Sequence, residues 1–341
     1  MRTEIVVGVD ASPGSAAALA WALDDASRRG VRVRAVLAWA DDSRPAEVDA
    51  IATSPGLEDL AAAADKVLRR LVAAARYAST GGDRLRLSGA QVPVDERTVY
   101  STAAHALLQE SFDAGLLVIG AEPRAATRWA LAGPVGDACA HEAPIPLVVV
   151  PPDAGTARSR HRAGKPVLVG VDGSRASAIA ARWAAGEAAL RRVPLRVLHV
   201  AAVRGTAPAQ SRVPMTIPVI NRTSALPWAP VGAVAATGRG GRGGGWAPVA
   251  AARTHAVLDP VDSVRRVVAG VRTMPGAPPV EPMSVAGGAA ATLLLEAAGD
   301  AQLLVLGARG AGGFPALSLG STAHQCLARV SCPTAIIRGH G

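Results

Sequence analysis

A stretch of small residues near the C-terminal end of the chain contains the residue types that bind phosphate. In residues 302–322, Gly307, Gly310 and Gly320 precede Ser321 and Thr322. Glycines let backbone N–H groups approach an anion because no Cβ lies in the way. A helix beginning at the serine adds N–H groups without intrahelical acceptors, a hydroxyl and a partial positive charge. The pattern predicts an anion site, although a glycine-rich loop without a ligand would look the same.

The spacing of this stretch is more specific than its composition. Gly307-x-x-Gly310, nine residues and then Gly320-Ser321 resembles the nucleotide-binding signature of the universal stress protein family. The resemblance implies that the motif lies between the fourth strand and the last helix of a small doubly wound domain. It also implies that the motif holds the phosphates of ATP, with or without Mg²⁺.

The chain contains an internal repeat of two similar copies. Residues 5–12, IVVGVDAS, recur as residues 167–174, VLVGVDGS, and residues 116–123, LLVIGAEP, recur as residues 303–310, LLVLGARG. The second pair of segments is further apart in the chain because the second copy contains extra residues. The resemblance covers nearly the whole chain apart from a linker and this insertion.

Each copy predicts short apolar strands that alternate with amphipathic helices, a pattern typical of a parallel sheet covered on both faces. We therefore expect an α/β protein with two tandem doubly wound, Rossmann-like domains of the adenine nucleotide alpha hydrolase-like type. In the first copy, a strand is expected at residues 85–92 and a helix at residues 98–111. The expected boundaries are residues 1–152 for the first domain, 153–165 for the linker and 166–341 for the second domain, with a Gly/Pro/Arg-rich insertion at about 204–259.

The second copy has the complete candidate site, because folds of this class bind ligands at the carboxyl ends of their strands. Asp172 ends the first strand of this copy, and its carboxylate could accept ribose or adenine hydrogen bonds or cap the following helix. The resemblance implies adenine contacts from Val171, Val200 and Leu306, whereas Arg309 could face either phosphate or solvent. The predicted nucleotide-binding residues are Val171, Asp172, Val200, Leu306, Gly307, Arg309, Gly310, Gly320, Ser321 and Thr322.

The first copy departs from this pattern. The residues that remain of its site are Val9, Asp10, Gly120 and Gly133. Pro123 and Pro134 replace the second glycine and the serine, and proline supplies neither an N–H nor a hydroxyl. We expect this domain to bind ATP poorly or not at all and to pair with the second domain. The family implies edge-to-edge pairing of the final strands, Leu147–Val150 and Thr334–Ile337, as an intrachain pseudo-dimer, and a homodimer is also open.

Catalysis and nucleic-acid binding have weaker support. The chain has no Gly-x-x-x-x-Gly-Lys-Ser/Thr motif, and neither of its lysines is near the glycine motif, so binding without fast turnover is expected. A slow ATPase or phosphotransferase remains an alternative, as does a structural protein without a ligand. The net charge of +9 is spread over both halves. The Arg/Gly-rich segment GRGGRGGGW at residues 238–246 leaves a nucleic-acid-associated protein as a further alternative, although a tolerated insertion is favoured there.

The remaining features suggest a cytoplasmic location. No long run of strongly apolar residues appears, so no membrane association is expected, and no N-terminal signal is apparent. Cys139, Cys326 and Cys332 lack metal-ligand spacing and are expected to be buried, inert thiols. His199 and His324 are each isolated, which favours structural roles and no metal site. The overall expectation is a nucleotide-dependent regulator or scaffold in stress response or growth arrest, with an unknown protein partner.

Overall fold

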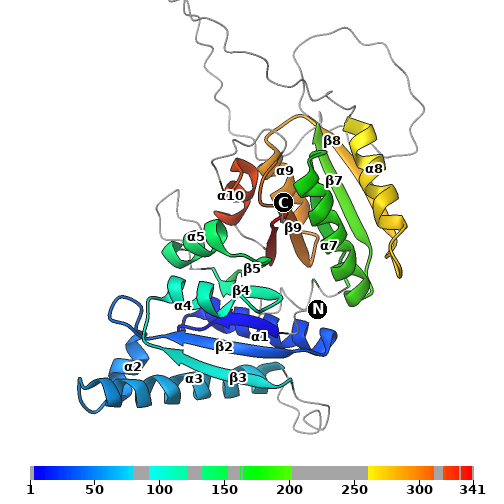
Figure 1. Ribbon diagram of the computed structural model, residues 1–341. Helices are drawn as coiled ribbons and strands as arrows, with labels where there is room; N and C mark the ends of the chain where they lie inside the picture. Colours follow the sequence, from blue (N-terminus) through cyan, green and yellow to red (C-terminus); the bar gives the residue numbers. More distant parts are fainter. Residues whose placement is uncertain are drawn as a thin grey trace, which may run out of the picture.

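The computed structural model describes residues 4–79, 92–121, 133–152, 162, 164–201, 260–310, 318–329 and 332–339 (Figure 1). The strands form a 10-stranded sheet in the order β3-β2-β1-β4-β5-β10-β9-β6-β7-β8. The strands are β1 (Glu4–Gly8), β2 (Arg32–Ala38), β3 (Val94–Val99), β4 (Leu116–Gly120), β5 (Leu147–Val150), β6 (Val167–Val171), β7 (Leu195–Ala201), β8 (Val280–Ala286), β9 (Leu303–Gly307) and β10 (Thr334–Ile337).

Helices cover both faces of this sheet. They are α1 (Pro13–Arg29), α2 (Ala46–Ile51), α3 (Leu57–Ser79), α4 (Ala103–Glu110), α5 (Gly133–Glu142), α7 (Arg175–Arg191), α8 (Pro260–Arg272), α9 (Ala290–Ala298) and α10 (Ser321–Leu327). Buried residues of α1, α3, α7 and α8 share one core, and those of α4, α5, α9 and α10 share the core on the other face. The expected pair of tandem doubly wound α/β domains is therefore confirmed.

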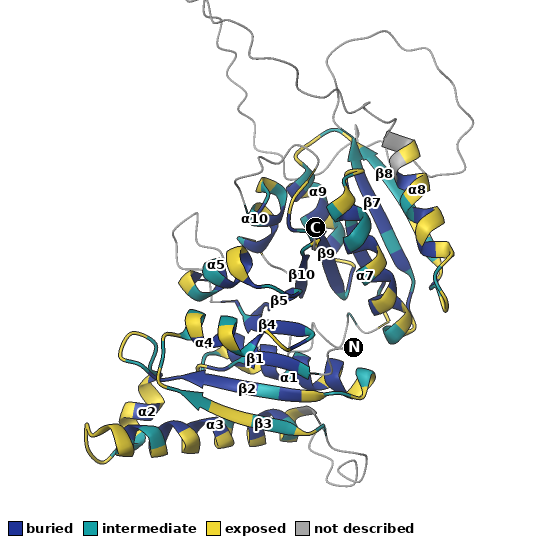
Figure 2. Ribbon diagram, in the orientation of Figure 1, coloured by how far each residue is buried: buried dark blue, intermediate teal, exposed yellow. Residues whose placement is uncertain are grey.

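The apolar strands explain why both faces are buried. In β1, Ile5 and Val7 belong to one core, whereas Val6 between them belongs to the other. This alternation follows from the two-residue period of a strand, and a strand buried on both faces needs apolar residues at every position. Figure 2 shows buried central strands, whereas the outer strands β3 and β8 are more exposed.

The two halves join at their final strands. β5 and β10 pair in antiparallel orientation, with Ala335 opposite Val148 and Ile336 opposite Leu147. All other strand pairs of the sheet are parallel. The predicted pairing of Leu147–Val150 with Thr334–Ile337 is thus present, and each half covers an edge that the other would leave exposed.

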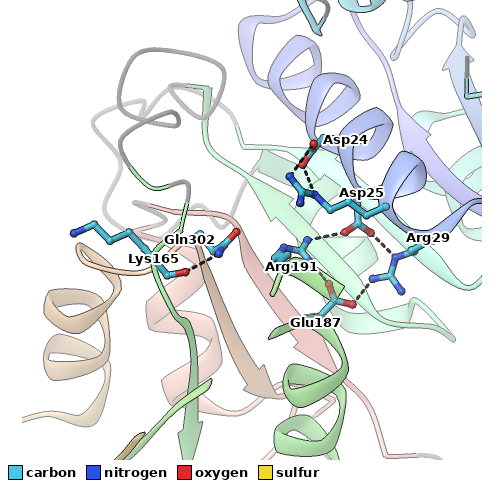
Figure 3. Close-up of polar contacts among 8 residues, drawn as sticks. Asp24, Asp25, Arg29, Lys165, Glu187, Arg191 and Gln302 are labelled. Atoms are coloured by element: carbon cyan, nitrogen blue, oxygen red, sulfur yellow. Dashed lines mark hydrogen bonds and ion pairs between the residues drawn. The ribbon is translucent and has the colours of Figure 1, made fainter. Parts of the chain in front are cut away.

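A buried ion-pair cluster supports this junction (Figure 3). Asp25 and Arg29 of α1 meet Glu187 and Arg191 of α7, which are the corresponding residues of the two copies. Asp25 accepts from Arg29 and from Arg191 at 2.6 Å each, and both arginines also pair with Glu187. The side chains of Asp25, Glu187 and Arg191 are only 1%, 3% and 5% exposed. Each buried carboxylate thus has two cationic partners, as burial of charge requires.

Two sequence predictions in the first half are wrong in position. The third strand is Val94–Val99 rather than residues 85–92, and the following helix begins at Ala103 rather than at residue 98. The segment VDERTV pairs along β2 from Val33↔Val94 to Ala38↔Val99 as a half-exposed outer strand, so it has no apolar run to reveal it. Residues 85–91, most of the linker and the 204–259 insertion lie outside the described residues.

Candidate functional site

The second half has a pocket of about 430 Å³ at the carboxyl ends of β6, β7 and β9. This volume is within the range of small-molecule binding sites. Every predicted residue of the second-copy site lines it: Val171, Asp172, Val200, Leu306, Gly307, Arg309, Gly310, Gly320, Ser321 and Thr322. Residues separated by more than a hundred positions in the chain therefore meet in one place.

The turn after β6 positions the carboxylate of Asp172. Gly173 has a φ of 82°, which a glycine adopts without strain. The Ser174 N–H then donates to Asp172 Oδ1 at 3.0 Å, and the Ser174 hydroxyl oxygen accepts from the Ser177 N–H at 3.0 Å to cap α7. Asp172 therefore stabilises the turn that leads into α7, which is the capping role that the sequence suggested as an alternative to ligand binding. Its second oxygen, Oδ2, faces Gly310.

The two ends of the glycine motif lie next to each other. The Ala308 N–H donates to Ile337 O at 2.9 Å, and the Gly320 N–H donates to Ala308 O at 2.7 Å. An ideal Cβ on Gly320 would lie 3.5 Å from Gly310 N, so these glycines are neighbours. Gly320 is the N-cap of α10, and Ser321 and Thr322 are in its first turn. The backbone and hydroxyl groups predicted to hold phosphate thus line one end of the pocket.

An apolar wall completes the pocket, and sequence reasoning found only part of it. Val171, Val200 and Leu306 were predicted, whereas the remaining lining residues were not: Gly170, Ser177, Leu198, Ala290, Leu294, Leu319 and Ala323. The strand period could have identified Leu198, which lies two residues before Val200. No sequence signal points to Ala290 and Leu294, because α9 reaches the pocket only through its packing on the sheet.

The corresponding pocket of the first half measures only about 70 Å³. Val9, Asp10 and Gly120 line it, but Gly133 does not. The turn after β1 repeats the second-half geometry, because the Ser12 N–H donates to Asp10 Oδ1 at 2.9 Å. The first-half site therefore keeps its carboxylate and has much less room than the second.

Close backbone packing accompanies the smaller pocket. An ideal Cβ on Gly120 would lie 2.2 Å from the carbonyl carbon of Gly14, whereas one on Gly307 would lie 3.1 Å from that of Ala176. Gly14 and Ala176 are equivalent positions in the two copies. Because neither Gly14 nor Gly120 carries a Cβ, the end of β4 can approach α1 more closely than the end of β9 approaches α7.

His199 lies in β7 beside the pocket. It is 7% exposed and faces Val171 and Ser284 in the strand register, and its Nδ1 has no hydrogen-bond partner within the described chain. Burial lowers the pKa of this imidazole, and the carboxylate of Asp172 opposes that shift. His199 is a buried neutral residue next to the site and does not line it.

The thiols and the metal-ligating residue types do not gather at the pocket. Cys139, Cys326 and Cys332 are buried, and burial raises the pKa of Cys139 and of Cys326 to about 12. Over the described ranges, no group of three His, Cys, Asp or Glu residues could hold a metal ion. Of the helices that the structure describes, none is long and apolar enough to cross a membrane.

The fold and the pocket together define a class of protein, a tandem Rossmann-like α/β protein with a ligand-sized pocket at the strand ends of its second domain. The sequence model of the universal stress protein family matches residues 1–151, 164–216 and 250–338. The chain belongs to the universal stress protein family.

Similar proteins span nearly the whole chain. A universal stress protein of Mycobacterium tuberculosis is 28% identical over 353 residues, covering 98% of this chain and 94% of the relative. One of Mycolicibacterium smegmatis is 29% identical over 336 residues, covering 98% and 96%. The crystal structure of a universal stress protein from Archaeoglobus fulgidus matches with a TM-score of 0.58, 13% identity and 98% coverage of both chains. At that identity, the structural likeness shows the fold alone.

Proposed function

We propose that the second-half pocket binds ATP and that the protein acts as a nucleotide-dependent regulator or scaffold in stress response or growth arrest. The observation that carries the proposal is the convergence of Asp172, the apolar strand ends and the glycine motif on one pocket. Membership of the universal stress protein family supports the regulatory role. ATP is abundant in the cytoplasm, where we place the protein.

The pocket matches the parts of ATP from one end to the other. Val171, Val200 and Leu306 supply apolar surface for an adenine ring. The Asp172 carboxylate can accept hydrogen bonds from ribose hydroxyls. The Gly310 N–H and the Ser321 N–H and hydroxyl supply donors for phosphate oxygens, while Gly320, whose own N–H donates to Ala308 O, leaves space beside Gly310. Asp172 is the one carboxylate in the described lining, so a Mg²⁺ ion would be held mainly by the phosphates and water.

The lining residues favour binding over turnover. Within the described part of the pocket, the polar side chains are Asp172, Ser177, Arg309, Ser321 and Thr322. Asp172 already accepts a backbone hydrogen bond, and Ser177 donates to Ser174 O at 2.9 Å. A general base positioned for an attacking water is therefore not supplied by these contacts. We propose a protein whose nucleotide occupancy, rather than its hydrolysis rate, is the signal.

The first domain serves in this proposal as the permanent partner of the second. Its pocket is small, and its phosphate motif contains Pro134 where the second copy has Ser321. The β5–β10 pairing and the Asp25–Arg29–Glu187–Arg191 cluster support our proposal that the two domains form an intrachain pseudo-dimer. Assembly into a homodimer of chains, or with another protein, would use surfaces outside this junction.

The test has two measurements. Adenine nucleotides released from the natively purified protein are identified and quantified, and the affinity for ATP is measured by titration. Gly320 has a φ of −78° and a ψ of 156° at the N-cap of α10, where both serine and aspartate are favoured. Gly320→Ser therefore preserves the cap without added charge, whereas Gly320→Asp places a carboxylate at the phosphate end. We expect the serine variant to retain ATP and the aspartate variant to lose it.

A matched pair of carboxylate variants tests which copy binds. Asp172→Asn and Asp10→Asn each remove the charge of the carboxylate in the equivalent turn, and the amide oxygen can still accept the turn hydrogen bond. We expect only Asp172→Asn to weaken ATP binding. Equal ATP binding by all four variants, or no adenine nucleotide bound by the wild-type protein, would refute the proposal, and rapid phosphate release dependent on Asp172 would favour an ATPase instead.

A further inference from the structure

Two arginine side chains leave adjacent strands at the glycine-motif end of the pocket. Ile337, the last residue of β10, lies opposite Gly307, and its carbonyl oxygen accepts from the Ala308 N–H at 2.9 Å. Arg338 follows Ile337 directly and Arg309 follows Ala308, so both arginines begin at the carboxyl edge of the sheet, just beyond the paired ends of β9 and β10. Arg309 lines the pocket directly.

Arg338 extends across the junction between the two halves. Its guanidinium donates to Ala140 O in the last turn of α5 and to Ser318 O at 3.5 Å, just before the pocket residue Leu319. Carbonyl oxygens at a helix C-terminus carry partial negative charge, which holds a cation there. A guanidinium has a planar fork of N–H donors, so these contacts through two nitrogens leave further donors available.

Among the residues that the structure describes, no carboxylate neutralises either guanidinium group. Neither Arg309 nor Arg338 forms an ion pair with any residue that the structure describes. Burial lowers the pKa of Arg338, and the positive charge of Arg309 lowers it further. Like charges held close together repel each other, and an anion between them removes that cost. Paired guanidinium groups are also well suited to phosphate oxygens.

We propose that Arg309 and Arg338 form a two-arginine clamp for the terminal phosphates of a nucleoside triphosphate. The inference rests on the proposed nucleotide site and adds that this site prefers a nucleoside triphosphate to a monophosphate. A monophosphate would be held by the glycines and Ser321 alone, whereas a triphosphate tail would reach the clamp. Because Arg338 also bonds Ala140 O, the clamp connects the ligand tail to α5 of the first domain.

The test compares ATP with AMP by calorimetric titration of the full chain. We expect Arg309→Ala and Arg338→Ala each to weaken ATP binding about 10-fold or more, because each variant loses charge-assisted hydrogen bonds to a phosphate oxygen. AMP binding should stay within about twofold of wild type, which also shows that the variants are folded. Arg265→Ala removes an arginine of α8 that is 60% exposed and should change neither affinity.

The alternative is that Arg338 only braces α5 against the loop at Ser318. In that case ATP and AMP binding would fall together, and the clamp would be overturned. Unchanged ATP binding in both variants, or equal wild-type affinities for ATP and AMP, would also overturn it while leaving the nucleotide site intact. A wild-type protein that binds neither nucleotide would refute the proposed function and the clamp together.

Discussion

The Cα of Gly310 lies against the carboxylate of Asp172, so that a Cβ built on Gly310 would stand 2.6 Å from Asp172 Oδ2. Asp172 belongs to the turn after β6, and Gly310 to the segment after β9. A glycine at position 310 therefore leaves room for the Asp172 side chain, which comes from the turn after a different strand.

Replacing Gly310 with alanine should displace Asp172 and weaken ATP binding about 10-fold. Gly310 does not have a positive φ, so the backbone itself accepts alanine. The matched control is Gly186→Ala in α7, where an added Cβ meets nothing within 4 Å. That change should raise the free energy of unfolding by about 1 kcal/mol, the helix preference of alanine over glycine, without changing affinity. Calorimetry and urea unfolding measure both quantities, and equal affinities in the two variants would contradict the steric argument.

The buried ion-pair cluster should make Arg191 important for stability. Arg191→Met leaves Asp25 and Glu187 with fewer cationic partners inside the protein, and breaking such a buried pair costs about 3–5 kcal/mol. The control Arg28→Met removes an exposed pair with Asp24, whose side chain is 61% exposed, and should cost about 0.5 kcal/mol or less. Urea unfolding of the full chain compares them. Similar losses in the two variants would show that the cluster contributes no more than a surface pair.

His199 should make the folded protein sensitive to mild acid. Its pKa is lowered from the ordinary 6.5, so the unfolded chain takes up the proton first. Stability should therefore be full above pH 6.5 and fall as the pH drops below it, by about 1.4 kcal/mol for each unit of pKa shift. His199→Leu, which introduces the residue found at the equivalent Leu37, should flatten this dependence.

The control for that experiment is His105→Gln, because His105 is an exposed residue of α4. The free energy of unfolding of the His105→Gln variant should follow the wild-type pH profile between pH 5 and pH 7.5. Removing the unpartnered Nδ1 should also stabilise His199→Leu at neutral pH by about 1 kcal/mol. An unchanged pH profile in His199→Leu would show that the imidazole titrates normally in the fold.

The cysteines should be unreactive in the native state. With a pKa raised to about 12, Cys139 and Cys326 have about one thiolate in ten thousand molecules at pH 8. Cys332 is 1% exposed and is also inaccessible. A thiol-specific reagent should label the native protein very slowly and label all 3 cysteines once it is unfolded. Rapid native labelling at one thiol would show that its core opens locally.

The sequence by itself determined the duplicated α/β fold and ten of the residues that line the second-half pocket. The repeats identify equivalent strands, and the carboxyl ends of parallel strands necessarily share one edge of a sheet. Asp172, Val200 and Gly307 follow or end such strands, so the sequence alone predicts that they meet at this edge. The position of β3 was predicted wrongly because VDERTV is a half-exposed outer strand without an apolar run.

Only the tertiary structure decided which side chains meet across the elements. The contact of Gly310 with Asp172, the wall formed by Ala290 and Leu294, and the bond from Arg338 to Ala140 O each join distant segments. Local periodicity tells which face of an element is buried, but not which residue of another element lies opposite. That choice follows from helix packing on the sheet and from the register of β5 against β10, and both depend on the whole folded chain.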